Sequence, residues 1–210
     1  MTPAGLRSFV SFATLLVKRI DRLDMALTTD EFLGLVMENP VVAGLLQRLP
    51  ALGLEQCYLT AGCLFQTVWN HRSGRPLQAA IKDYDVFYFD DSDLSWEAED
   101  KVIRAGLHLV EDLTGLVEIR NQARVHLWYE QRFGAPSPRL RSAIDGIDRF
   151  LIPCTCIGIN VRTKEVYAPN GLEDMWDGIL SMNPLNPQSP RFYEKAEDYR
   201  SRWPWLTIRR

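Results

Sequence analysis

Two aspartates, Asp83 and Asp85, lie inside an otherwise apolar stretch, IKDYDVFYFDDSD (residues 81–93). The aromatic and β-branched residues around them favour a β-strand that is buried on at least one side. Side chains two residues apart in a strand point to the same face, about 7 Å from each other at the backbone. Two carboxylates held this close repel each other, so the pattern indicates either an open, solvated strand edge or a bound cation.

Two other segments predict partners for this pair. The segment 55–62 reads as a strand that ends in Gly62, and a helix follows from Cys63, so backbone N–H groups at the helix start could bind phosphate. The segment LVEIRN (116–121) reads as a third strand, in which Glu118 alternates with apolar neighbours that point into the core. Three carboxylates on adjacent strands would suit Mg²⁺, which is usually bound together with substrate phosphates. Two such ions can clamp the attacking and leaving oxygens of a phosphoryl displacement.

Structural alternatives exist for each of these residues. The three carboxylates could be solvated surface groups. Lys82 flanks the aspartates and could steer phosphates, or it could be an ordinary flanking charge. Arg124 follows the third strand and could hold a phosphate through two hydrogen bonds, whereas Asn121 beside it could simply cap the next helix. His126 could be a general base or a packed histidine.

Helices are expected around these strands. Asn39 and Ser95 are predicted to cap two of them, and Thr29 a third. A hairpin with a tight turn at 163–164 is expected near the C-terminal end. The further expected helices cover residues 63–74, 122–134, 137–151, 171–180 and 189–203.

The composition indicates a globular domain with a substantial core. Of 210 residues, 46% are hydrophobic and 24% are charged. The formal net charge of −3 does not indicate a broad basic surface, so any nucleic acid would have to bind a local patch. The four cysteines lack zinc-site spacing, which fits a reducing, cytoplasmic compartment, and the two in the apolar run at 154–156 are expected to be buried thiols. These cysteines are Cys57, Cys63, Cys154 and Cys156.

The first 28 residues are predicted to form an amphipathic helical extension to a domain that spans residues 29–210. Their apolar run, SFVSFATLLV, is shorter than the ~20 residues that a membrane span requires. No membrane association is therefore expected, and the helix would dock on the domain or on a partner.

Four motifs make the chain resemble a known family, over residues 31–205. They resemble a predicted bacterial nucleotidyltransferase family within the DNA polymerase β-like nucleotidyltransferase superfamily. The motifs are LTAGCLFQTVWN, KDYDVFYFDDSDLSWEAE, VEIRNQARVHLWY and VYAPNGLEDMW.

The resemblance implies an α/β (α+β) fold with a short mixed sheet backed by helices. It also implies that Asp83, Asp85 and Glu118 are the catalytic metal ligands, and that Gly62 and Cys63 form the turn at the nucleotide. The sequence departs from the superfamily pattern at two of these positions. Cys63 stands where many active members have a serine that touches the triphosphate, and the third acid is Glu rather than Asp.

Two classes of function follow. The first is an enzyme that uses Mg²⁺ or Mn²⁺ to transfer a nucleotidyl group from an NTP to an acceptor, which could be a small molecule, a protein or a nucleic acid. Lys82 and Arg124 would help to bind the nucleotide. The second is a catalytically inactive protein of the same fold that binds a nucleotide or a partner. A phosphoesterase of this fold is a further, less favoured option.

Overall fold

The computed structural model describes residues 27–134 and 136–209. The expected N-terminal amphipathic helix lies outside this range. In the described part of the chain, no helix is long and apolar enough to cross a membrane.

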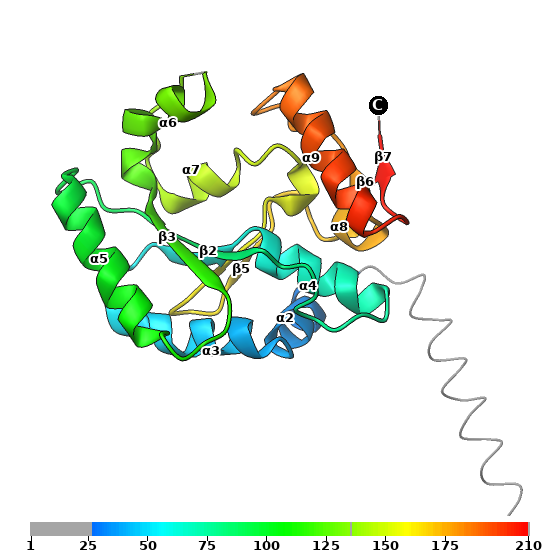
Figure 1. Cartoon of the computed structure of the whole chain (residues 1–210), viewed down its shortest axis with the longest axis horizontal. Coiled ribbons are helices and arrows are strands. Elements are labelled where there is room, and N and C mark those ends of the chain that lie inside the picture. Colours follow the sequence, from blue (N-terminus) through cyan, green and yellow to red (C-terminus); the bar gives the residue numbers. More distant parts are fainter. Residues whose placement is uncertain (1–26, 135, 210) are drawn as a thin grey trace, which may run out of the picture.

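A five-stranded mixed sheet lies at the centre of the fold, with strand order β3-β2-β1-β4-β5. Strands β2 and β3 are parallel, and the other neighbouring pairs are antiparallel. This mixed sheet backed by helices is the predicted fold class (Figure 1). The strands are β1 (Cys57–Thr60), β2 (Asp83–Tyr88), β3 (Leu116–Asn121), β4 (Gly158–Asn160) and β5 (Val166–Tyr167). A separate parallel pair is formed by β6 (Ile179–Leu180) and β7 (Thr207–Ile208).

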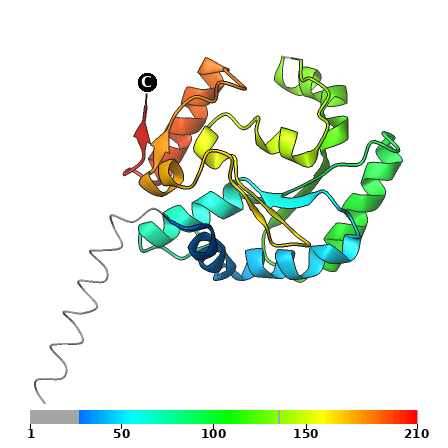
Figure 2. The same ribbon diagram turned by 180° about the vertical axis from the view of Figure 1, so that it is seen from behind.

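Helices lie on both sides of the sheet. The N-terminal helices and α5 cover one face, while α6, α7 and α9 stand on the other side (Figures 1 and 2). The α-helices are α2 (Thr29–Met37), α3 (Pro40–Arg48), α4 (Gly62–Arg72), α5 (Trp96–Leu109), α6 (Val125–Phe133), α7 (Ala143–Ile147), α8 (Glu173–Asp177) and α9 (Ser189–Arg202). Short 3₁₀ helices are η1 (Leu49–Leu52), η2 (Gln122–Arg124) and η3 (Pro153–Thr155).

Alternating burial in β2 and β3 separates a core face from an open face. Tyr84, Val86 and Tyr88 are buried in the core, as are Val117 and Ile119 in the neighbouring strand. Helix α5 packs closely on β3 because a side chain is absent from Gly106, where a Cβ would lie 2.3 Å from the Ile119 Cδ1 atom. The open face of the two strands is thereby turned toward α6, α7 and α9.

Most expected helix starts are confirmed. Asn39 caps α3, whose first residue is Pro40, and Ser95 caps α5. The predicted cap Thr29 is wrong by one residue: Thr28 caps α2 and forms a capping box with Glu31.

The expected helix over 137–151 is mostly wrong. Only α7 is helical there, and it begins after Ser142, whose hydroxyl accepts from the Asp145 backbone N–H. Pro138 does not by itself exclude a helix, since a proline is tolerated in the first turn, but the helix begins later, where Ser142 supplies the cap. The segment before α7 therefore runs in non-helical conformation along the open side of the sheet.

Candidate active site

The strand register brings the three predicted carboxylates together. Asp85 lies opposite Glu118 in the parallel pair β2–β3, and Asp83 lies opposite Leu116. Val117 is buried, so Glu118 points to the open face. The predicted position of Glu118, on an adjacent strand and on the same face as the aspartates, is confirmed.

These carboxylates form part of the floor of a pocket with a volume of about 470 Å³. Its other walls come from the start of α4, from α6, α7 and α9, and from the connections between them. The pocket carries more positive than negative side chains, so it suits a ligand with several negative charges. The basic residues in its walls include Lys82, Arg120, Arg149, Arg191, Lys195 and Arg202.

The carboxyl of Asp85 is affected both by burial and by neighbouring charges. Burial, followed by the negative charges of Asp83 and Glu118, raises the pKa of its carboxyl from 3.8 to about 7. Lys195 and Arg120 oppose this shift with their positive charges. A cation in front of the strand would relieve the same repulsion.

The turn between β1 and α4 has a strained backbone. Ala61 has φ of 61° and ψ of −138°, a conformation that L-residues with a side chain rarely adopt. Gly62 follows, where a Cβ would lie 2.6 Å from the Gln66 Nε2 atom and 3.9 Å from the Asp83 Oδ1 atom. Within the described chain, no side chain caps α4, and its first residues line the pocket. The helix start can therefore offer its N–H groups to an anion.

The side chain of Cys63 does not reach this pocket. It is fully buried, and its thiol donates to the Thr60 carbonyl at 3.3 Å. Burial raises the pKa of the thiol well above its usual value. The prediction that Cys63 helps to bind the nucleotide is therefore not supported for its side chain, which faces the core from the first turn of the helix.

Arg124 is also placed differently from the prediction. Its guanidinium forms a buried ion pair with Glu99 of α5, and its Nε atom donates to the Leu94 carbonyl at 3.0 Å. The guanidinium lies 5.6 Å from the centre of the Trp96 ring and is not among the groups that line the pocket. Because Arg124 pairs with the buried Glu99 carboxylate, its side chain links α5 to the end of β3 and does not face the pocket.

Lys82 does line the pocket, at an exposed position. Its Nζ atom lies 3.7 Å from the Asp198 Oδ1 atom of α9. The lysine remains a candidate for guiding phosphates into the site.

The donor set fits a hard cation only in part. Asp83 and Asp85 offer carboxylate oxygens on one face, and Mg²⁺ is commonly held by one or two carboxylates plus substrate phosphates. Among the described residues, however, no group of three or more His, Cys, Asp and Glu is arranged to hold a metal ion. Glu118 instead accepts from the Arg120 Nη2 atom at 3.2 Å. Glu118 shares the face of the two aspartates, but its charge is paired with that of Arg120, two residues along the same strand.

Several pocket residues were missed at the sequence level. Arg120 alternates with Glu118, so a period of two would have placed it on the same face. Arg191, Lys195 and Arg202 follow helical spacing and form one face of α9, next to its buried face. Tyr129 and Phe133, aromatic residues of α6, also line the pocket. No pattern in the sequence indicates that they belong to a site.

Comparisons with known proteins agree with this architecture. A family model described as "Nucleotidyltransferase" matches residues 47–208. A solved structure titled "The NMR structure of the protein reveals a CCA-adding enzyme head domain" aligns with a TM-score of 0.67 and 22% sequence identity. The alignment covers 89% of this chain and 98% of that one, and at this identity it shows a shared fold. No match is found among curated proteins.

Proposed function

The chain belongs to this nucleotidyltransferase family, and we propose that it transfers a nucleotidyl group from a nucleoside triphosphate to a hydroxyl acceptor. The observation that carries the proposal is the common face of Asp83, Asp85 and Glu118 in a pocket rich in basic side chains. The acceptor class, whether small molecule, protein or nucleic acid, stays open.

Asp83 and Asp85 would hold Mg²⁺ or Mn²⁺. When bound, the ion would neutralise charge on the phosphates and position them for in-line displacement. The raised pKa of Asp85 supports this role, because the crowded carboxylates gain more from a cation than isolated ones would.

The chain's own residues would divide the remaining tasks. The start of α4, with Gly62, and the amino group of Lys195 would hold the triphosphate in place. The acceptor oxygen forms a bond to the α-phosphorus while the bond from that phosphorus to the pyrophosphate oxygen breaks. Glu118 would take the proton of the acceptor hydroxyl. Arg120, released from Glu118, would stabilise the negative charge that develops on the phosphates.

A second candidate is favoured by one specific observation. Glu118 is paired with Arg120, and no metal-binding group of three acids is formed among the described residues. A protein that binds nucleotides without transferring them would need only the basic pocket and the aspartate pair. Only the transferase would release pyrophosphate, so this product distinguishes the two candidates.

The test is a screen for pyrophosphate release with each of the four NTPs, Mg²⁺ or Mn²⁺, and pools of small-molecule, protein and RNA acceptors. Release that disappears in Asp85→Asn but persists in Glu111→Gln, an exposed acid of the loop after α5, would support transfer. Binding of NTP without release in any pool would favour the second candidate. Absence of both binding and release would overturn the proposal.

A further inference from the structure

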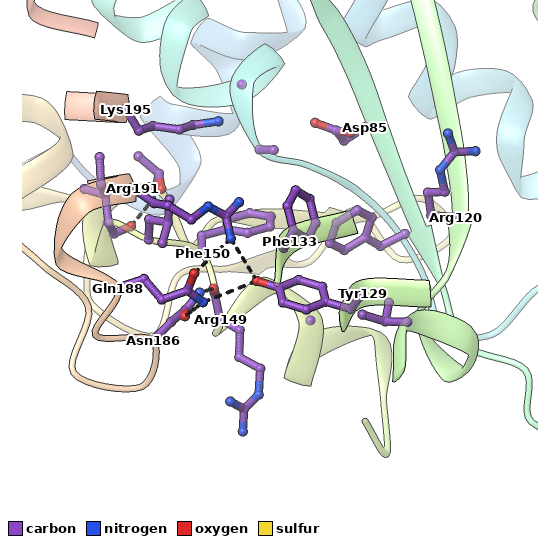
Figure 3. Close-up of a pocket in the computed structure, with 18 of the residues that line it drawn as sticks. Asp85, Arg120, Tyr129, Phe133, Arg149, Phe150, Asn186, Gln188, Arg191 and Lys195 are labelled. Carbon is purple, nitrogen blue, oxygen red and sulfur yellow. Dashed lines mark hydrogen bonds between the residues drawn. The ribbon is translucent and has the colours of Figure 1, made fainter. Parts of the chain in front are cut away.

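A preorganised cluster of side chains lies in the pocket on the side of α6 and α9 (Figure 3). It is formed by Tyr129 and Phe133 of α6, Arg191 of α9, and Asn186 and Gln188 of the connection that precedes α9. We refer to these five residues as the α6–α9 cluster. Neither the family match nor the predicted carboxylates assign it a role.

The cluster brings one arginine plane and two aromatic rings together. The Arg191 guanidinium lies 4.2 Å from the centre of the Phe133 ring. The Tyr129 and Phe133 rings lie 4.7 Å apart at their centres and are tilted against each other. Nucleobases stack on aromatic rings and on arginine planes of this kind, and the stacking tolerates every base because each has a π-face.

The hydrogen bonds inside the cluster leave donors for a ligand. The Tyr129 hydroxyl oxygen accepts from Arg191 Nη1 at 3.3 Å and from Gln188 Nε2 at 3.5 Å, so its proton is available to donate. Arg191 Nη1 also donates to the Gln188 Oε1 atom at 2.9 Å. Among the described residues, the hydrogen bonds of the guanidinium are made through Nη1, so its Nε and Nη2 groups can bind a ligand. A ligand that fits this arrangement presents acceptors on a planar edge.

The cluster lies close to the residue of α9 whose charge acts on the acids. Lys195 follows Arg191 by one helical turn, which is about 6 Å along α9. Its amino group points toward the side of the pocket where Asp85 lies (Figure 3). Its positive charge is also among those that act on Asp85. Phosphates near Lys195 and Asp85 would leave a base within reach of Arg191.

We propose that the α6–α9 cluster binds the base of the donor nucleotide and favours guanine, whose O6 and N7 atoms are adjacent acceptors that an arginine can contact with two N–H groups. This inference rests on the proposed function. Adenine offers a donor at the position of O6, so it would leave Arg191 and the Tyr129 proton without one acceptor.

Calorimetric titration with the α,β-methylene analogues of GTP and ATP, in the presence of Mg²⁺, tests the assignment. The wild type is expected to bind the GTP analogue about tenfold or more tightly than the ATP analogue. Arg191→Ala should weaken GTP-analogue binding by about tenfold to a hundredfold and abolish the preference. Tyr129→Phe should reduce the preference without abolishing binding.

Two further variants keep the test decisive. Arg200→Ala lies on the same helix, where Arg200 pairs with Glu197 at the surface, and should bind both analogues as the wild type does. Arg191→Lys keeps the positive charge but lacks the planar guanidinium, so it should bind the GTP analogue more weakly than the wild type. This variant provides the test if Arg191→Ala fails to fold.

Equal affinity for the two analogues in the wild type, or unchanged affinity in both Arg191 variants, would overturn the inference. Unchanged affinity in both Arg191 variants is the result expected if the cluster binds the acceptor instead of the donor base. In either case, pyrophosphate release from NTP would leave the proposed function intact. Failure of both analogues to bind, together with absence of release, would overturn both.

Discussion

Asp85 of β2 lies directly opposite Glu118 of the parallel strand β3, and both side chains point into the same pocket. Parallel neighbours in register place their side chains on one face, so the charge of each acid acts on the other. This relationship contributes to the raised pKa of Asp85, and it underlies the first three predictions below.

Asp83 and Asp85 should bind a divalent ion as a pair. Asp83→Asn and Asp85→Asn should each weaken Mn²⁺ binding by about tenfold or more, because each removes one of the two carboxylates on this face. Calorimetry or paramagnetic NMR would measure the affinity, with Glu111→Gln as a control for net charge. Equal Mn²⁺ binding by the wild type and both variants would contradict the prediction.

Glu118→Gln should lower turnover by about 10²–10⁴-fold, because the amide cannot accept the proton of the acceptor hydroxyl. Nucleotide affinity should change little, since this acid acts on the acceptor rather than on the phosphates. The measurement requires kcat from pyrophosphate release and affinity from titration. A large loss of affinity with unchanged kcat would assign Glu118 to nucleotide binding instead.

The stability of the metal-free protein should depend on pH through Asp85. Its pKa is raised from 3.8 to about 7 in the folded state, so the folded protein binds this proton more tightly than the unfolded chain does. The stabilisation is fully present below about pH 4 and is lost as the pH rises through about 7. Denaturant unfolding of wild type and Asp85→Asn across this range should show the decline only in the wild type. A parallel decline in both proteins would attribute it to other groups.

Ala61→Gly should stabilise the protein by ~1 kcal/mol. A non-glycine residue in this backbone conformation costs about 1–3 kcal/mol, which exceeds the extra ~0.5–1 kcal/mol of chain entropy that glycine loses on folding. Ala105→Gly, at an exposed position of α5, is the matched control and should destabilise by ~1 kcal/mol. Destabilisation by both substitutions would show that Ala61 is not strained.

Arg124→Ala should destabilise the fold by about 3–5 kcal/mol, because it leaves the buried Glu99 carboxylate without its partner. Nucleotide affinity of the folded fraction should remain at the wild-type value. Thermal or denaturant unfolding gives the first quantity, and titration with a nucleotide analogue at low temperature gives the second. A selective loss of affinity with unchanged stability would return Arg124 to the phosphate site.

Local patterns in the sequence were sufficient to predict the acidic residues that form the floor of the pocket. The period of two in β2 and β3 predicts which face Asp83, Asp85 and Glu118 occupy, because alternation is a property of the strand itself. The helix caps Asn39 and Ser95 can be predicted for a similar reason, since a capping side chain accepts from an N–H group only two or three residues away.

The roles of Cys63 and Arg124 depended on contacts distant in sequence. Both stand next to predicted site residues: the resemblance places Cys63 in the turn at the nucleotide, and Arg124 is a candidate phosphate ligand with a structural alternative. Cys63 turns into the core on the first turn of α4, and Arg124 reaches Glu99, which lies on a different helix. Which of several nearby groups an arginine pairs with is decided by burial of the competing charge, and burial is not encoded in spacing.

The sequence by itself determined strands β2 and β3, their inward and outward faces, and the carboxylates on the outward face, because these follow from backbone periodicity. Only the tertiary structure decided that α6 and α9, far apart along the chain, meet across the pocket and bring Tyr129 to Arg191. Such a contact results from the packing of whole helices against the sheet, which no local pattern specifies. The same packing placed Lys195 of α9 where its positive charge acts on Asp85.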